Sequence, residues 1–306
     1  MKKILFLFIT AILLVGCSNN ASGDIGKETK PLVVTTTGQI ADAVKEIAGD
    51  QVEIKSLMGP GVDPHLYKAT QGDLQTLEKA DIIFYNGLEL EGKMSDIFEK
   101  MKKEKKVVGI GDIVPRNQIL KDEAHPELSD PHIWFDIKVW ELATKEITKT
   151  LSEELPDSKE EFAKNEEVFF KKLSDLSEWT DQRISEIPEK QRVLVTAHDA
   201  FNYFGNSHGM EVRGLQGLST DSEYGLKDIQ NIVDFLVENN IKAVFIESSV
   251  SDKAMKAVIE GAKEKGHTIK IGGELYSDAM GAEGTEEGNY IGMYKHNVNT
   301  IVDSLK

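Results

Sequence analysis

The chain has 306 residues and a formal net charge of −16, with 36 Lys and Arg against 52 Asp and Glu. This charge argues against nucleic acid or an anionic membrane as the functional surface, because both require clustered basic side chains, whereas a cation is compatible with it. Hydrophobic residues make up 40% of the sequence, enough for buried cores, and the length corresponds to about two domains of roughly 150 residues each.

The first seventeen residues have the order of a bacterial export signal. Lys2 and Lys3 precede an apolar run over 4–15 that is broken only by Thr10. This run is too short to cross a bilayer, which needs about 20 apolar residues, but it is typical of a signal peptide. The following Leu-Val-Gly-Cys17 resembles the lipobox of bacterial lipoproteins, in which the cysteine is acylated and becomes the mature N-terminus.

Cys17 is the only cysteine in the chain, so the sequence excludes disulfides and cysteine metal ligands. Residues 18–30 are polar, with Gly, Ser and Asn among them, and we predict that they form a flexible tether. The sequence therefore predicts a lipoprotein signal peptide over 1–17, lipidation of Cys17, and anchoring to the extracytoplasmic face of the cell membrane.

Past the tether, short apolar runs alternate with longer helical patterns, which is typical of βα units and a parallel sheet. The predicted strands form two sets of four. The sets have similar openings, Val33-Val34-Thr35-Thr36 and Leu194-Val195-Thr196-Ala197, and this similarity favours a duplicated βα domain. The predicted strands cover 32–36, 51–57, 82–85 and 106–110 in the first set, and 193–196, 211–215, 243–247 and 268–271 in the second.

A long helical pattern from Pro156 to Ile187 separates the two sets, and Pro188 follows its end, where proline is expected. About 30 residues at 1.5 Å per residue give a helix roughly 45 Å long, which can join two lobes. A lone coiled-coil strand is the alternative, but five apolar positions do not sustain a heptad repeat. Those positions form a single stripe on a charged segment: Phe162, Phe169, Leu173, Leu176 and Trp179.

These patterns predict an α/β fold of two βα lobes, each with a four-stranded, mainly parallel sheet. The N-terminal lobe is predicted over 31–153 and the C-terminal lobe over 189–306. One long rigid helix over 154–188 joins them in this prediction.

The tripeptide Asp-Pro-His occurs twice, at 63–65 and 130–132, in a chain with only seven histidines. Proline fixes its own φ and pushes the preceding residue into an extended conformation, so each histidine leaves a stiffened loop in a restricted direction. A neutral imidazole held in this way suits a metal, and a neighbouring carboxylate can accept its second ring N–H. The alternative is that both tripeptides are turns followed by a capping or surface histidine.

Two further candidates lie near strand ends in the second set. His198 stands where a strand gives way to a helix, and Asp278 lies a few residues beyond the strand predicted to end near Ile271. Open α/β sheets bind ligands at the carboxyl ends of their strands. A cation between the lobes would then contact His65 and His132 of one lobe and His198 and Asp278 of the other. Three nitrogens and one carboxylate suit a divalent first-row metal.

Four motifs occur in order around these residues. They are Gly-Val-Asp-Pro-His65-Leu-Tyr, Asp-Pro-His132-Ile-Trp-Phe-Asp, Thr-Ala-His198-Asp-Ala-Phe-Asn-Tyr-Phe-Gly and Leu-Tyr-Ser-Asp278-Ala-Met. Together they resemble the metal-binding lipoproteins of bacterial ABC transporters for manganese and zinc, over essentially the whole mature chain. The resemblance implies a single buried metal held by His65, His132, His198 and Asp278, and delivery to a membrane permease by a monomeric binding protein.

The choice of metal lies between manganese and zinc. Imidazole suits zinc and carboxylate oxygens suit manganese, and many manganese-specific members have a glutamate where this chain has His198. Zinc-specific members carry a long His- and acid-rich loop, whereas this chain has only the short stretch 121–127 around His125. The sequence after Thr196 and over 215–222 most resembles the manganese lipoproteins of Bacillus relatives. We predict Mn(II), with Zn(II) as the alternative, and bidentate binding by Asp278 would add a further donor.

The other polar candidates are assigned mainly structural roles. His208, His267 and His296 lie at element ends or in the last helix, and His125 could help to capture ions from a mobile acidic loop. Glu247 ends a strand and points toward the cleft by the same topology rule. A buried salt bridge is the role favoured for Glu247, because glutamate is rarely buried unpaired.

A secreted zinc hydrolase is the rival function. Such an enzyme needs an open coordination position and a placed general base, and the sequence has no His-Glu-x-x-His helix to supply them. Four protein ligands would instead close the site. A surface adhesin role has been attached to members of the family that the motifs resemble, but nothing in the sequence argues for it separately. We therefore predict a binding protein and not an enzyme.

Overall fold

Strands and helices alternate along the part of the chain that the computed structural model describes, residues 30–122 and 125–306. The predicted signal peptide, Cys17 and all of the predicted tether except Lys30 lie outside the described residues. Within the described ranges, no helix combines the length and apolar composition needed to cross a membrane. The fold is α/β with parallel sheets, which confirms the predicted class.

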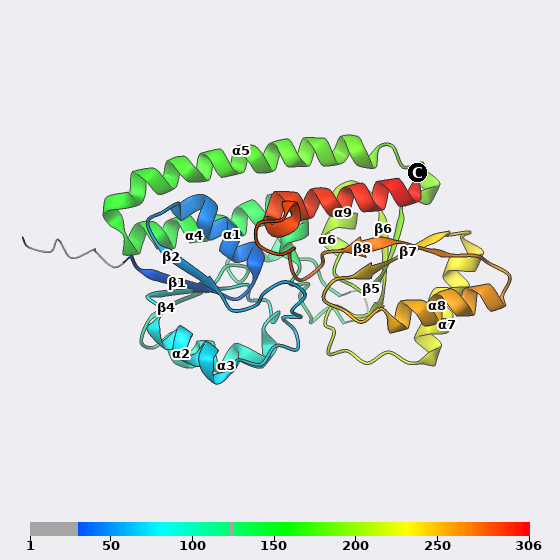
Figure 1. The fold of residues 1–306 in the computed structure, drawn as a ribbon, viewed down its shortest axis with the longest axis horizontal. Coiled ribbons are helices and arrows are strands. Elements are labelled where there is room, and N and C mark those ends of the chain that lie inside the picture. The colour runs from blue at the N-terminus through cyan, green and yellow to red at the C-terminus, as the bar shows by residue number, and fades with distance from the viewer. Residues whose placement is uncertain (1–29, 123–124) are drawn as a thin grey trace, which may run out of the picture.

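The N-terminal half, meaning the elements before the long helix α5, is built on one parallel sheet with the strand order β2-β1-β3-β4. Figure 1 shows α1 and α4 on one side of this sheet and α2 and α3 on the other. The strands are β1 (Leu32–Thr35), β2 (Glu53–Ser56), β3 (Ile82–Tyr85) and β4 (Lys106–Gly109), and the helices are α1 (Gly38–Ala48), α2 (Gln71–Lys79), α3 (Ser95–Met101) and α4 (Ile137–Glu154).

Both faces of this sheet are buried, as expected for parallel strands covered by helices. Successive residues of a strand point to opposite faces, so Val33 joins the core that contains α1 and α4, while Val34 packs with residues of α2 and α3. This arrangement directs the carboxyl ends of the strands, and the loops that follow them, to a single edge of the sheet.

The C-terminal half, meaning the elements after α5, departs from the predicted four-stranded sheet. It has two separate parallel pairs, β5-β6 and β7-β8. β5 and β7 pack side by side, but no ladder joins them within the described residues. The strands are β5 (Val193–His198), β6 (Glu211–Gln216), β7 (Ala243–Glu247) and β8 (Lys270–Leu275), and the helices are α6 (Asn202–His208), α7 (Leu226–Glu238), α8 (Lys253–Glu264) and α9 (Tyr290–Leu305).

One side-chain hydrogen bond and one irregular strand pairing accompany these differences. At the end of β5 the N–H of His198 donates to the Glu247 carboxylate rather than to a β7 carbonyl. The prediction for the last strand was also wrong, because β8 runs to Leu275 and not to Ile271. The register of its pairing with β7 shifts between Val244 and Phe245. Gly272 and Gly273 lie opposite this shift, and two adjacent glycines in a sequence usually indicate the end of a strand. A Cβ at Gly272 would lie 2.6 Å from the Phe245 ring, so the close approach requires glycine.

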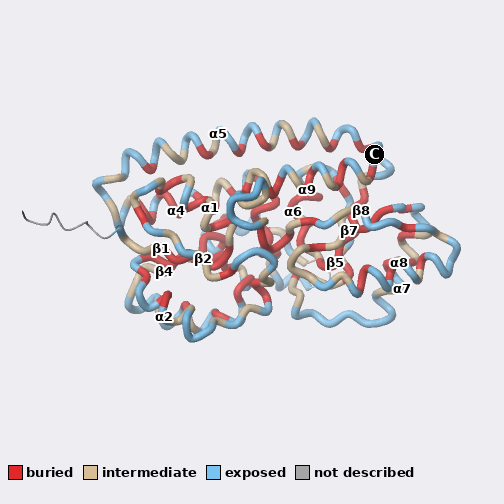
Figure 2. The backbone as a smooth tube through the Cα atoms, in the orientation of Figure 1, coloured by how far each residue is buried: buried red, intermediate tan, exposed pale blue. Residues whose placement is uncertain are grey.

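The long helix α5 spans Lys159–Ile184, or 26 residues, and a short 3-10 helix at Pro156–Ser158 precedes it. It runs along one side of the molecule past both halves (Figure 1) and packs on α1, α4 and α9. Figure 2 shows a mostly exposed outer face. Of the predicted stripe, Trp179 is only partly buried, and Thr180 and Ile184 continue the buried face instead.

Candidate metal site

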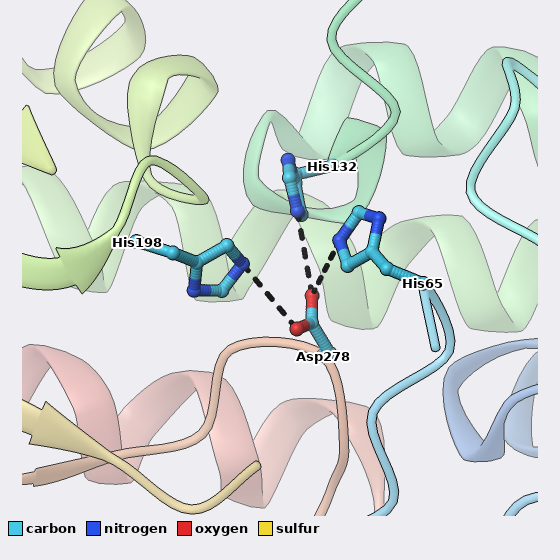
Figure 3. Close-up of side chains that lie close together, drawn as sticks. All are labelled: His65, His132, His198 and Asp278. Carbon is cyan, nitrogen blue, oxygen red and sulfur yellow. Dashed lines mark ion pairs between the residues drawn. The ribbon is translucent and has the colours of Figure 1, made fainter. Parts of the chain in front are cut away.

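His65, His132, His198 and Asp278 converge at the edge where the two halves meet, and Figure 3 shows three imidazoles directed at one carboxylate. Their potential ligand atoms lie within 4.8 Å of one another, and all four side chains are buried. His65 lies in the loop after β2, His132 before α4, His198 at the end of β5, and Asp278 just after β8. The structure thus brings together all four predicted ligands, two from each half.

Both carboxylate oxygens of Asp278 lie close to imidazole nitrogens of the cluster. Its Oδ1 lies 3.4 Å from Nε2 of His132 and 3.9 Å from Nε2 of His65, and its Oδ2 lies 3.3 Å from Nε2 of His198. The three Nε2 atoms and Oδ1 are buried without a hydrogen-bond partner. Each such atom costs about 1–3 kcal/mol if left unsatisfied, and one divalent cation at the centre would satisfy all of them.

The repeated tripeptide folds in the same way at both places. In each, the aspartate Oδ1 accepts the backbone N–H of the histidine two residues later, at 2.9 Å for Asp63 and His65 and at 2.9 Å for Asp130 and His132. The side chain of Asp130 also lies 2.8 Å from Nδ1 of His132. This contact places a proton on Nδ1, so that Nε2, which faces the other candidate ligands, is the nitrogen that would bind a metal. Asp130 therefore orients a candidate ligand.

Glu247 orients His198 in a similar manner. Its Oε1 accepts the His198 N–H at 2.9 Å, and its Oε2 lies 2.5 Å from Nδ1 of the same residue. The salt bridge favoured from the sequence is therefore made to a predicted ligand, whose ring and backbone Glu247 contacts at the same time. The sequence indicated this position, because Glu247 ends a strand and the carboxyl ends of strands are where α/β sheets bind ligands.

Hydrogen bonds from both halves hold the Asp278 loop in place. The indole Nε1 of Trp134, two residues after His132, donates to the carbonyl of Ser277 at 3.0 Å. The Tyr290 hydroxyl donates to the carbonyl of Trp134 at 2.6 Å. The hydroxyl of Ser249 lies 3.4 Å from Oδ2 of Asp278. Sequence reasoning missed these partners, because Trp134 and Ser277 are 143 positions apart.

The electrostatics differ among the three imidazoles. Burial lowers the pKa of His65 to about 3. Burial acts in the same direction on the other two, but the carboxylates of Asp130 and Asp278 outweigh it and raise the pKa of His132 to about 9. Glu247 and Asp278 likewise raise the pKa of His198 well above its usual value. The raised pKa values favour the protonated forms of His132 and His198 in the absence of metal, so a metal has to compete with protons at these two ligands.

The remaining histidines lie outside the cluster. His125 is exposed beside Glu127. His208 contacts Asp181 and Tyr294, and Gly209 after it has a left-handed conformation at the end of α6. His267 and His296 contact backbone carbonyls.

Comparison with known proteins identifies the family. A sequence model of the family described as zinc-uptake complex component A, periplasmic, matches residues 33–304. The chain belongs to this family. It is 51% identical over 300 residues to the manganese-binding lipoprotein MntA of Bacillus subtilis, covering 98% of this chain and 97% of that protein. It is 46% identical over 285 residues to the zinc-binding protein TroA of Treponema pallidum, covering 93% of this chain and 92% of that protein.

The fold is shared as well. The solved structure of the periplasmic zinc-binding protein TroA from Treponema pallidum superposes with a TM-score of 0.88 at 47% identity, covering 90% of this chain and 99% of that chain. The predicted resemblance to metal-binding components of manganese and zinc ABC transporters is confirmed. The chain is a metal-binding transport component, and this membership sets aside the rival zinc hydrolase.

Proposed function

We propose that this chain captures Mn(II) between two lobes and delivers it to the permease of an ABC transporter. The observation that carries the proposal is the convergence of four buried, inward-directed donors from His65, His132, His198 and Asp278. Residues 31–153 and 189–306 form the two lobes in this proposal, and the segment 154–188 acts as a rigid connection because α5 packs on helices of both halves.

Manganese is favoured by the carboxylate geometry and by the 51% identity to a manganese-binding lipoprotein. Both oxygens of Asp278 face the centre of the cluster, so a bidentate carboxylate would add an oxygen donor of the kind that manganese prefers. Zinc is the second candidate. Three imidazoles suit it, and the relative at 46% identity is a zinc-binding protein.

Elemental analysis of cells tests the cargo better than affinity alone, because zinc binds most nitrogen and oxygen sites more tightly than manganese does. Cells that lack this protein, grown in low-manganese medium, should accumulate less manganese with unchanged zinc. Returning the intact gene should restore manganese. A fall in zinc alone would favour the second candidate, whereas no change in either metal would contradict the proposed transport.

Metal affinity should rise steeply with pH. A proton held by a ligand in the metal-free protein must leave before the metal binds, and His132 and His198 hold such protons because their pKa values are raised. His65 is already neutral, since its pKa is lowered to about 3. We expect release of more than one proton per ion near neutral pH, and therefore a gain of more than about tenfold in affinity per pH unit. Calorimetry in buffers of different ionisation enthalpy measures this release, and a pH-independent affinity would contradict the ligand set.

We also propose that the mature protein is a monomer anchored on the extracytoplasmic face by a lipid on Cys17. Two acyl chains hold a protein stably on a membrane, whereas one does so only marginally. Cys17→Ala should therefore appear in the medium or remain as unprocessed precursor, as measured by fractionation and immunoblotting. Processed Cys17→Ala protein that still sediments with membranes would contradict the anchor.

A further inference from the structure

A segment of the C-terminal half crosses to the N-terminal half at the first Asp-Pro-His tripeptide. This segment, residues 217–225, connects β6 to α7 and is called the strap. The hydroxyl of Thr220 donates to Oδ2 of Asp63 at 2.6 Å. The next residue, Asp221, forms an ion pair of 2.6 Å with Lys93. Two adjacent strap residues therefore contact the N-terminal half beside the candidate site.

Asp63 connects the strap to a proposed metal ligand. Its Oδ1 accepts the backbone N–H of His65 at 2.9 Å, while its Oδ2 accepts the Thr220 hydroxyl. One carboxylate thus bonds within its own half through one oxygen and across to the other half through the second. The position of the strap is thereby coupled to the backbone that carries His65.

The other end of this connection lies beside a second proposed ligand. Gln216, the last residue of β6, pairs in register with His198 of β5. Its side-chain Nε2 donates to the carbonyls of Thr220 at 3.2 Å and Ser222 at 3.0 Å, which fixes the strap turn on the strand next to His198. A chain of contacts therefore links the two proposed ligands. It runs from His198 to Gln216, then through the strap to Asp63, and from Asp63 to His65.

We infer that Thr220 is a positioning residue that holds the metal site closed and sets the rate of metal release. This inference rests on the proposed function. The Thr220 hydrogen bond is partly buried and has a charged acceptor, and such bonds are about twice as strong as neutral ones. The ion pair between Lys93 and Asp221 is solvent-exposed, with side chains 38% and 54% accessible, and contributes little by comparison.

In this inference the strap acts on release rather than on capture, because Thr220 and Asp63 belong to different halves and their hydrogen bond has to break before the halves can move apart. Breaking their hydrogen bond is a step on the way out for the ion. The ion associates before this bond forms. Loss of the hydroxyl should therefore raise the rate constant for release and leave the rate constant for association unchanged. General damage to the fold would instead lower the fraction of protein able to bind.

The test compares Thr220→Val, which removes the hydroxyl at similar volume, with Thr220→Ser, which keeps it. Protein loaded with Mn(II) is mixed with excess chelator in a stopped-flow instrument, and tryptophan fluorescence reports release, because Trp134 lies with its ring centroid 5.3 Å from that of His132. We expect release about tenfold faster for Thr220→Val, equivalent to about 1.4 kcal/mol. Association should stay within about twofold of wild type, and Thr220→Ser should release at close to the wild-type rate.

Ser222→Ala is the matched control. It removes a hydroxyl from the same strap, and the hydrogen bonds that Ser222 makes among the described residues come from its backbone, which the substitution keeps. Wild-type release from Thr220→Val, or release from Thr220→Ser as fast as from Thr220→Val, would overturn the inference while leaving the proposed function intact. A wild-type protein that takes up neither Mn(II) nor Zn(II) would overturn the proposed function and, with it, this inference.

Discussion

Replacing Asp278 by alanine should nearly abolish manganese binding. Asp278 is the one anionic side chain among the four candidate ligands, and its two oxygens face imidazoles from both halves. Loss of a residue that only orients a ligand typically lowers metal affinity about 10–100-fold, so we expect loss of this ligand to lower the affinity by at least about a hundredfold. Zinc should lose less than manganese, because it tolerates an all-nitrogen site better. Titration of each metal, with competition against a chelator of known affinity, measures the two losses.

His198→Glu should shift the preference in the opposite direction, because it replaces a nitrogen with hard oxygen donors. Asp157→Ala, at an exposed aspartate in the 3-10 helix before α5, serves as the control and should bind like wild type. In the wild-type protein, saturating metal should also raise the melting temperature, since it binds only the folded state. Unchanged manganese binding by Asp278→Ala would remove the proposed site between the halves.

Glu247→Ala should weaken both the site and the fold. The substitution leaves the backbone N–H and the Nδ1 of His198 buried without the carboxylate that contacts them. Loss of an orienting partner of this kind typically lowers metal affinity about 10–100-fold. Loss of one side of a buried ion pair lowers the free energy of unfolding by about 3–5 kcal/mol. Denaturant unfolding of metal-free protein and metal titration at the same pH measure the two effects.

Two further variants test whether the charge of Glu247 is responsible: Glu247→Gln removes only the charge, and Glu264→Ala is the control at an exposed glutamate. The glutamine keeps the volume and one acceptor but loses the charge, so its effects should fall between those of wild type and alanine. Glu264 is an exposed residue at the end of α8, and replacing it should change stability by less than about 0.5 kcal/mol. If Glu247→Ala unfolded and bound metal like the Glu264 variant, the orienting role of Glu247 would be wrong.

The convergence of the four candidate ligands was predicted better than the second half of the fold. Three of the candidate ligands can be located from their immediate neighbours in the sequence. His65 and His132 follow Asp-Pro, and His198 ends β5. The strands Ile82–Tyr85 and Ala243–Glu247 match their predicted bounds because buried β-branched and aromatic runs have clear ends. In β8, by contrast, two glycines inside the strand read as a break, although close packing against Phe245 requires one of them.

The partners that orient the ligands could not be predicted in the same way. The contact of Asp130 with His132 is local, and the tripeptide contains its signal. The contacts of Glu247 with His198 and of Thr220 with Asp63 depend on which strands and loops become neighbours after folding. A single sequence gives no measure of that proximity. The predicted domain boundaries and the lipid anchor stay predictions, and the anchor lies outside the described residues.

The division of the four donors, two on each half, makes each half a weak chelator by itself. A metal held by both halves gains the advantage of multidentate binding, in which one donor keeps the ion close while another rebinds. Once the halves separate, each retains only a pair of donors, His65 with His132 or His198 with Asp278. Neither half has to unfold, and no ligand has to be altered chemically, for the ion to be lost. In the proposed function, the four donors together would therefore retain the ion tightly, and a movement that parts even one pair of donors from the other would be enough to release it.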